Sequence, residues 1–176
     1  MKFSTVVVSV SIFFLSSCHK ETESESSHPS TDSFESGLSA TVAGARIQAD
    51  SVKARLFVDT TIFPFPWRFL IIDGYYDHGT KVIETGFNDT SLSIFPEVKS
   101  YDSLMALNGG SLCGYYLLTD SAKEFLPVNA HFSITYSDTV HQKISGSFDG
   151  LLIESQTQDS ITILNGRFDN VSYILE

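Results

Sequence analysis

Positive charges are scarce in this sequence, and so are charged residues of any kind. Its 176 residues include 11 Lys and Arg against 21 Asp and Glu, so the formal net charge is −10, and charged residues make up only 18% of the chain. A chain with this balance lacks the basic patch that binds nucleic acid or an anionic membrane surface. We therefore expect no nucleic-acid partner, and we interpret the acidity mainly as a source of solubility.

Signatures of common enzyme families are missing as well. The chain contains no Gly-x-Ser-x-Gly elbow, no phosphate-binding loop and no His-Glu-x-x-His pattern, and it has only two cysteines. These absences favour a binding or structural role over catalysis. They give no reason to expect a cofactor or a metal, and they leave open whether the protein is an enzyme.

No apolar run is long enough to cross a bilayer as a helix. The longest, residues 6–15, has about ten residues and follows the positively charged start Met1-Lys2, as in a secretory signal peptide. The next residues, Leu15-Ser16-Ser17-Cys18, resemble the bacterial lipobox, in which small residues admit the signal peptidase and the Cys thiol accepts a diacylglycerol group. We expect residues 1–17 to be a lipoprotein signal peptide and Cys18 to carry the acyl chains, palmitate among them, that anchor the protein in the outer membrane.

Residues 18–36 form a polar segment after the expected anchor. The segment is rich in Ser, Glu and Thr and has no apolar periodicity, which is typical of a disordered tether. The cluster Lys20-Glu21-Thr22-Glu23 resembles the acidic signal that sends Bacteroidetes lipoproteins to the outer face of the outer membrane, but a solvated linker has a similar composition. Whether the protein faces the periplasm or the cell surface therefore stays open.

Residues 37–176 have the pattern of one β-domain. Short alternating apolar runs are separated by turn residues, without the alternation of strands and helices that marks a parallel sheet. We predict an antiparallel β-sandwich or a partly closed barrel. A short helix is possible near residues 97–107, where Val98, Tyr101, Leu104 and Met105 recur at helical spacing.

A repeated phrase marks the end of the chain, residues 143–174. Gly-Ser-Phe-Asp at 146–149 returns as Gly-Arg-Phe-Asp at 166–169, and each copy lies in an alternating run. This arrangement predicts a long hairpin with Phe148 opposite Phe168 and Leu152 opposite Leu164. The glycines then indicate a bulge, a bend or a closely packed neighbouring strand.

The lipobox, the polar tether and this ending together resemble one protein family. Residues 144–148 (Ile-Ser-Gly-Ser-Phe), residues 161–168 (Ile-Thr-Ile-Leu-Asn-Gly-Arg-Phe) and Gly114-Tyr115-Tyr116 are similar to motifs of uncharacterised Bacteroidetes outer-membrane lipoproteins. The resemblance implies a β-rich domain of unknown function that is anchored to the outer membrane. It implies no catalytic residues, because the matching positions are glycines and core aromatics.

The aromatic run Phe63, Phe65 and Trp67 is the most promising candidate for a binding patch. Aromatic side chains interleaved with prolines can stack on sugar rings or receive a peptide. The same residues can also cap the end of a β-core. An exposed patch of several hundred Å² would favour binding.

Weaker candidates for chemistry are a thiol and two sets of carboxylates. Cys113 could act as a nucleophile with His131 or His141 as its base, although a buried thiol fits its apolar strand better. Asp149 and Asp169 could form a carboxylate pair of the kind that hydrolyses glycosides. The second set, Asp73 and Asp77 with His78, could hold a metal ion, although its spacing matches no strong metal motif.

The sequence therefore predicts a membrane-anchored cell-envelope lipoprotein that binds a glycan, a peptide or an outer-membrane protein, or that has a structural role. Two alternatives remain: an envelope hydrolase on a β scaffold, and a carrier of a small apolar ligand inside a barrel. An apolar cavity would favour the carrier, and a pocket with convergent polar groups would favour the enzyme.

Overall fold

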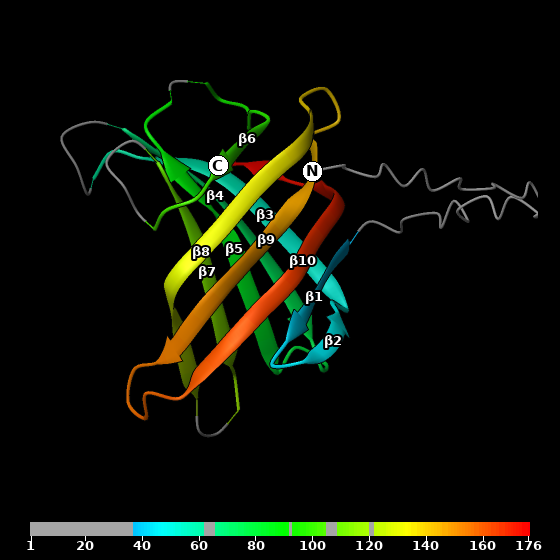
Figure 1. Ribbon diagram of the computed structural model, residues 1–176. Coiled ribbons are helices and arrows are strands. Elements are labelled where there is room, and N and C mark those ends of the chain that lie inside the picture. Colours follow the sequence, from blue (N-terminus) through cyan, green and yellow to red (C-terminus); the bar gives the residue numbers. More distant parts are fainter. Residues whose placement is uncertain (1–36, 62–65, 92, 105–108, 120–121) are drawn as a thin grey trace, which may run out of the picture. The chain divides into compact units, whose positions relative to one another are not determined.

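The computed structural model describes residues 37–61, 66–91, 93–104, 109–119 and 122–176, which form a single curled sheet (Figure 1). These residues contain eleven strands and no helix. In chain order the strands are β1 (Gly37–Val42), β2 (Ala45–Gln48), β3 (Ser51–Asp59), β4 (Trp67–Tyr76), β5 (Lys81–Asp89), β6 (Lys99–Tyr101), β7 (Gly110–Leu117), β8 (Lys123–Asp138), β9 (Lys143–Glu154), β10 (Ser160–Ser172) and β11 (Ile174–Leu175). The prediction of an all-β fold is confirmed, and the curled sheet corresponds to the partly closed barrel.

The strand order explains how the sheet curls into a half-barrel. Along the sheet the order is β11-β3-β4-β5-β7-β8-β9-β10-β1-β2, and β6 pairs with β8 outside this path. All pairs are antiparallel except β11 with β3. Because β11 follows β10 directly in the chain, its pairing with β3 joins the two sides of the curl. A second link lies at the β2–β3 corner, where the Ala49 amide donates to the Leu38 carbonyl at 2.8 Å.

The concave side of the sheet is filled with aromatic side chains. Phe87, Phe132, Phe148 and Phe168 are all at most 1% exposed. The rings of Phe132 and Phe168 stack with their centroids 5.1 Å apart, and Tyr101 stacks on Phe87 at 4.5 Å. Each such side chain contributes about 1.5–3 kcal/mol by leaving water. The interior is therefore a packed core.

The predicted hairpin exists, but its register differs from the prediction by two residues. Phe148 is opposite Gly166, and Phe168 is opposite Gly146. A shift of two residues keeps every side chain on its face, so both rings still point into the core. The predicted pairing of Phe148 with Phe168 is wrong because each ring needs the space that the opposite glycine leaves. A Cβ on Gly146 would lie 2.4 Å from the Phe168 ring, and one on Gly166 would lie 2.7 Å from the Phe148 ring.

A bulge in β10 also removes Leu164 from its predicted place opposite Leu152. Leu152 is paired with Ile161, and the register shifts between Ile163 and Gly166. Asn165, inside the bulge, adopts a left-handed backbone with φ of 52°. The extra residue turns Leu164 outward to 50% exposure while Ile163 is fully buried.

The helix expected near residues 97–107 is absent from the described part of that segment, so this prediction is wrong. Lys99–Tyr101 is strand β6, paired with residues 132–134 of β8. The helical spacing was misleading because its members do not share a buried face: Tyr101 is 4% exposed, whereas Val98 is 66% exposed. Met105 lies outside the described residues.

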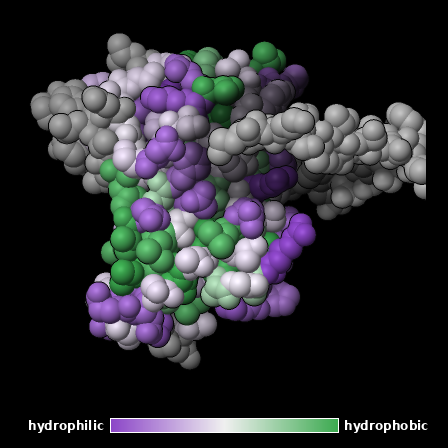
Figure 2. Space-filling view, in the orientation of Figure 1, coloured by the Kyte–Doolittle hydropathy of each residue, from purple (hydrophilic) through white to green (hydrophobic). Residues whose placement is uncertain are grey.

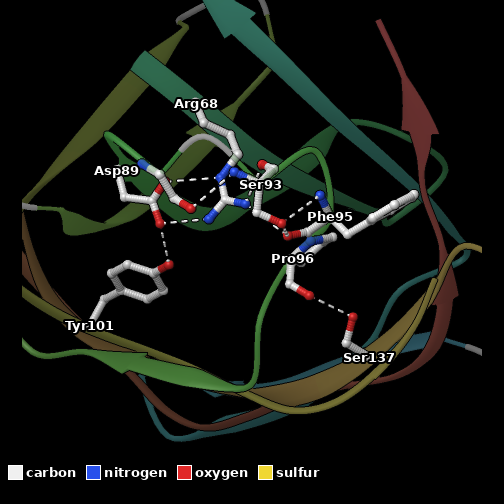
Figure 3. Close-up of polar contacts among 8 residues, drawn as sticks. Arg68, Asp89, Ser93, Phe95, Pro96, Tyr101 and Ser137 are labelled. Carbon is white, nitrogen blue, oxygen red and sulfur yellow. Dashed lines mark hydrogen bonds and ion pairs between the residues drawn. The ribbon is translucent and has the colours of Figure 1, made fainter. Parts of the chain in front are cut away.

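A buried ion pair anchors the segment between β5 and β6 at one end of the half-barrel (Figure 3). The Arg68 guanidinium donates from Nε and Nη2 to the Asp89 carboxylate at 2.9 and 2.7 Å. Its Nη1 donates to the carbonyls of Ser93 and Phe95, both at 2.7 Å. The Tyr101 hydroxyl donates to Asp89 at 2.7 Å. Arg68 therefore supplies the hydrogen bonds that this irregular backbone cannot obtain from a neighbouring strand.

This network also sets the protonation of Asp89. Burial alone would raise the pKa of its carboxyl, but the hydrogen bonds from Arg68 and Tyr101 outweigh burial and lower the pKa below its usual value. On the other side of the segment, the Ser137 hydroxyl of β8 donates to the Pro96 carbonyl at 2.7 Å (Figure 3). The connection is thus fixed to both walls, which makes the Arg68 network a structural feature.

Candidate functional site

Of the predicted site residues at the N-terminal side, only Trp67 can be placed. Cys18, Phe63 and Phe65 lie outside the described residues. Trp67 is 3% exposed, and its ring lies 6.2 Å from that of Phe69 on the convex side of β4. The Trp67 ring is therefore part of a packed aromatic cluster.

Cys113 is a core residue of β7. Burial is the main reason that the pKa of its thiol rises, to about 12, so the thiolate is scarce at neutral pH. The two histidines considered as its base are engaged with carboxylates instead. His131 Nδ1 lies 2.5 Å from Asp102, and His141 Nδ1 lies 2.7 Å from Asp138. The structure therefore does not bring Cys113 together with His131 or His141.

Asp149 and Asp169 are separated by the register of the hairpin. Phe168 is opposite Gly146, so Asp169 is level with Ser145, the residue before Gly146 on β9. Asp149 lies four residues after Ser145 on the same strand. At about 3.3 Å per residue, the two carboxylates are roughly 13 Å apart along the strands. This separation exceeds that of a glycosidase pair.

Two adjacent hollows lie along the convex side of β3 and β4, and we call them together the β3–β4 trough. The first, of about 410 Å³, is lined by Asp50, Ser51, Lys53, Tyr75, His78 and Gly79. The second, of about 400 Å³, is lined by Val52, Lys53, Ala54, Arg55, Asp73, Tyr75, Ser172, Ile174 and Glu176. Lys53 and Tyr75 line both hollows, so they stand between them.

Strand alternation explains why polar groups gather in the trough. In β3 the side chains of Ala54 and Leu56 point into the core, so Lys53 and Arg55 point outward. The antiparallel register places Lys53 opposite Asp73 and Ser51 opposite Tyr75. Lys53 Nζ lies 5.3 Å from the centre of the Tyr75 ring, as in a cation–π contact.

The turn between β4 and β5 fixes the far end of the trough. Asp77, His78 and Gly79 are consecutive residues with positive φ, of 54°, 57° and 80°. The His78 amide donates to the Asp50 carboxylate at 3.0 Å, which ties this turn to the β2–β3 corner. Asp77 forms an ion pair with Lys81 at 2.9 Å, and this contact lowers the pKa of Asp77. Of the predicted group Asp73, Asp77 and His78, the trough therefore contains Asp73 and His78.

Two charges in the trough have no fixed partner. Within the described residues, neither Arg55 nor Asp73 makes a side-chain hydrogen bond or an ion pair shorter than 4 Å. Asp73 is only partly exposed, and burial raises the pKa of its carboxyl, while Arg55 and Lys53 act against that rise. The partly buried Asp73 and the exposed Arg55 are therefore available to bind a polar ligand.

A second carboxylate lies beside Asp73. Glu84 of β5 is directly opposite Asp73, and burial, followed by repulsion from Asp73, raises the pKa of Glu84. The Tyr116 hydroxyl lies 3.4 Å from Glu84 Oε1, and the Tyr116 ring lies against Gly114, where a Cβ would be 2.7 Å from its hydroxyl oxygen. The convex face of β4, β5 and β7 therefore continues the trough with two destabilised carboxylates.

A different part of the convex face is apolar. Figure 2 shows apolar side chains gathered over the lower halves of β8 and β9. Leu126 and Val128 of β8 are 44% and 49% exposed, and Leu151 and Ile153 of β9 are partly exposed beside them. Val128 lies at a register shift in β8, which turns its side chain outward.

Comparison with known proteins finds no match for this chain among protein-family models, curated proteins or solved structures. In the described part of the chain, no helix is long and apolar enough to cross a membrane. The candidate site therefore rests on the geometry of the trough alone.

Proposed function

We propose that this protein is a lipid-anchored module of the cell envelope that binds a glycan in the β3–β4 trough. The observation that supports this proposal most directly is the set of polar groups around Tyr75. Among the described residues, Arg55 and Asp73 have no fixed partner, and they lie beside an aromatic ring on the sheet. A sugar offers hydroxyl groups that bind to charges of both signs and a C–H face that packs on an aromatic ring.

The packing of the core favours this function over the alternatives. Within the described residues, the concave side of the sheet is lined by buried side chains such as Phe132 and Phe168, whose rings stack, so the proposal places the ligand on the convex face. The residues considered for hydrolysis, Asp149 and Asp169, lie too far apart to act together.

A glycan array tests the binding proposal. The full chain with Cys18→Ser, which keeps the protein free of acyl chains, is applied beside the same chain carrying Tyr75→Ala. We expect a defined set of glycans to be bound, with an affinity at least about tenfold lower for Tyr75→Ala, equivalent to about 1.4 kcal/mol. Tyr136→Ala, at an exposed tyrosine of β8 outside the trough, is the matched control and should bind as the parent does. Equal binding by the parent and Tyr75→Ala would contradict the proposal.

The anchor is tested separately, by metabolic labelling with an alkyne analogue of palmitate in a bacterial host that processes lipoproteins. We expect the wild-type chain to incorporate the label and to extract with detergent, and Cys18→Ser to do neither. Cys113→Ala is the control that should keep the label, because Cys113 is buried. Label retained in Cys18→Ser, or absent from the wild type, would refute lipid attachment at Cys18.

A further inference from the structure

We infer that the β3–β4 trough binds an oligosaccharide across two subsites, one on each side of Tyr75; this inference rests on the proposed glycan-binding function. The two hollows have similar volumes, about 410 and 400 Å³, each within the range of small-ligand sites. They share only Lys53 and Tyr75. A ligand that fills both must therefore pass over the Tyr75 ring, so it has at least two linked units.

Each hollow has its own set of polar groups, so each can hold a separate sugar unit. The first contains the Asp50 carboxylate, the Ser51 hydroxyl and His78. The second contains the Arg55 guanidinium and the Asp73 carboxylate, with Ser172 and Glu176 on its opposite side. Carboxylates accept hydrogen bonds from sugar hydroxyls and the guanidinium donates to them, so both units would be oriented by hydrogen bonds.

Hydrogen bonds of the fold hold the borders of both subsites in place. His78 and Asp50 are joined by a hydrogen bond of 3.0 Å, so the first hollow is fixed before a ligand arrives. The second hollow is bordered by β11 at the end of the chain, which pairs with β3 through Arg55 and Leu56. Lys53, whose long side chain lies over Tyr75, can move aside when a sugar ring takes its place.

Isothermal titration calorimetry with sugars of increasing length tests this inference. The probes are glucose, galactose and N-acetylglucosamine, each with its di- and trisaccharide, and the protein is the full chain with Cys18→Ser. For the series that binds, we expect the disaccharide to bind at least tenfold more tightly than the monosaccharide. Arg55→Ala should weaken binding of the disaccharide more than binding of the monosaccharide and so remove most of this gain, because a single unit can still occupy the first hollow. Tyr75→Ala should weaken both.

The control for Arg55→Ala is Arg46→Ala, at an exposed arginine of β2 outside both hollows, which should bind every sugar as the parent does. Thermal unfolding of each variant verifies that it folds. Equal affinity for the monosaccharide and disaccharide would overturn the two-subsite inference and leave glycan binding intact. Absence of binding in all three series would overturn the proposed function and this inference together.

Discussion

The ring of Phe168 lies directly against Gly146 on the neighbouring strand, where a Cβ would be only 2.4 Å from its Cζ atom. The same arrangement occurs in the other copy of the repeated phrase, with Phe148 against Gly166. Each ring covers a glycine that would otherwise expose its backbone and contribute no packing, which is how aromatic residues compensate for glycine in a sheet. The repeat is therefore a pair of reciprocal contacts that holds β9 to β10.

Alanine at Gly146 should destabilise the protein strongly. The new methyl group would lie 2.0 Å from the Ser133 carbonyl oxygen as well as against Phe168, so backbone or ring must move. We expect Gly146→Ala to lower the free energy of unfolding by about 2–3 kcal/mol, and Gly166→Ala to act in the same direction. Ser147→Ala, between Gly146 and Phe148 and on the outward face of β9, is the control. Urea unfolding measures all three, and a change below 0.5 kcal/mol for Gly146→Ala, roughly the effect of an ordinary surface substitution, would contradict the reciprocal packing.

Removing one partner of the buried Arg68–Asp89 ion pair should lower the free energy of unfolding more than removing one partner of a surface ion pair. Asp89→Asn leaves the Arg68 guanidinium uncompensated beside a segment that it anchors, so we expect a loss of about 3–5 kcal/mol. Asp77→Asn, which breaks the exposed pair with Lys81, is the matched comparison and should have little effect. Similar melting temperatures for the two variants would show that the Arg68 network is not what fixes the end of the half-barrel.

The lowered pKa of Asp89 also determines how the stability of the fold depends on pH. The pKa of Asp89 is lower in the folded protein than in the unfolded chain, so its contribution is present above the unfolded value of about 3.9 and is lost as the pH falls further. We expect the stability of the wild type to fall more steeply below about pH 4 than that of Asp89→Asn. Chemical unfolding at a series of pH values measures this, and parallel curves for the two proteins would exclude the assigned role of Asp89.

Glu84→Gln should stabilise the protein at neutral pH. The pKa of Glu84 is raised in the folded state, so the ionised carboxylate destabilises the fold above that pKa, and protonation at lower pH relieves the cost. We expect the variant to gain about 0.5–1 kcal/mol at pH 7 and to lose that advantage as the pH approaches 4. A variant that is less stable than the wild type at pH 7 would show that Glu84 is held by stabilising contacts and does not belong to a destabilised binding face.

Apolar alternation was sufficient to predict an all-β body and the hairpin of β9 and β10. It identified the buried face of β9, where Ile144, Phe148 and Leu152 are all at most 1% exposed. It could not fix the register, because a shift of two residues preserves the faces and the choice depends on how a phenyl ring fits over a glycine. The β10 bulge at Asn165 has no signal in the hydrophobic pattern.

The trough could have been anticipated only in part. The outward positions of β3 and β4 carry Lys53, Arg55, Asp73 and Tyr75, which a strict alternation places on one face. That Arg55 and Asp73 find no partner among the described residues depends on the tertiary fold. The return of the chain to β3 through β11 depends on it as well. The Arg68–Asp89 pair was missed for the same reason, since an arginine in an apolar strand does not reveal which carboxylate it meets.

The most direct test of glycan binding at the β3–β4 trough is an NMR titration of the ¹⁵N-labelled full chain carrying Cys18→Ser with the disaccharide that it binds most tightly. We expect the amide signals that shift to belong to residues 50–55, 73–79 and 172–176, and those of Gly146 and Phe168 to stay unchanged. Shifts confined to other surfaces, such as Leu126 and Val128 on the apolar face of β8, would contradict it.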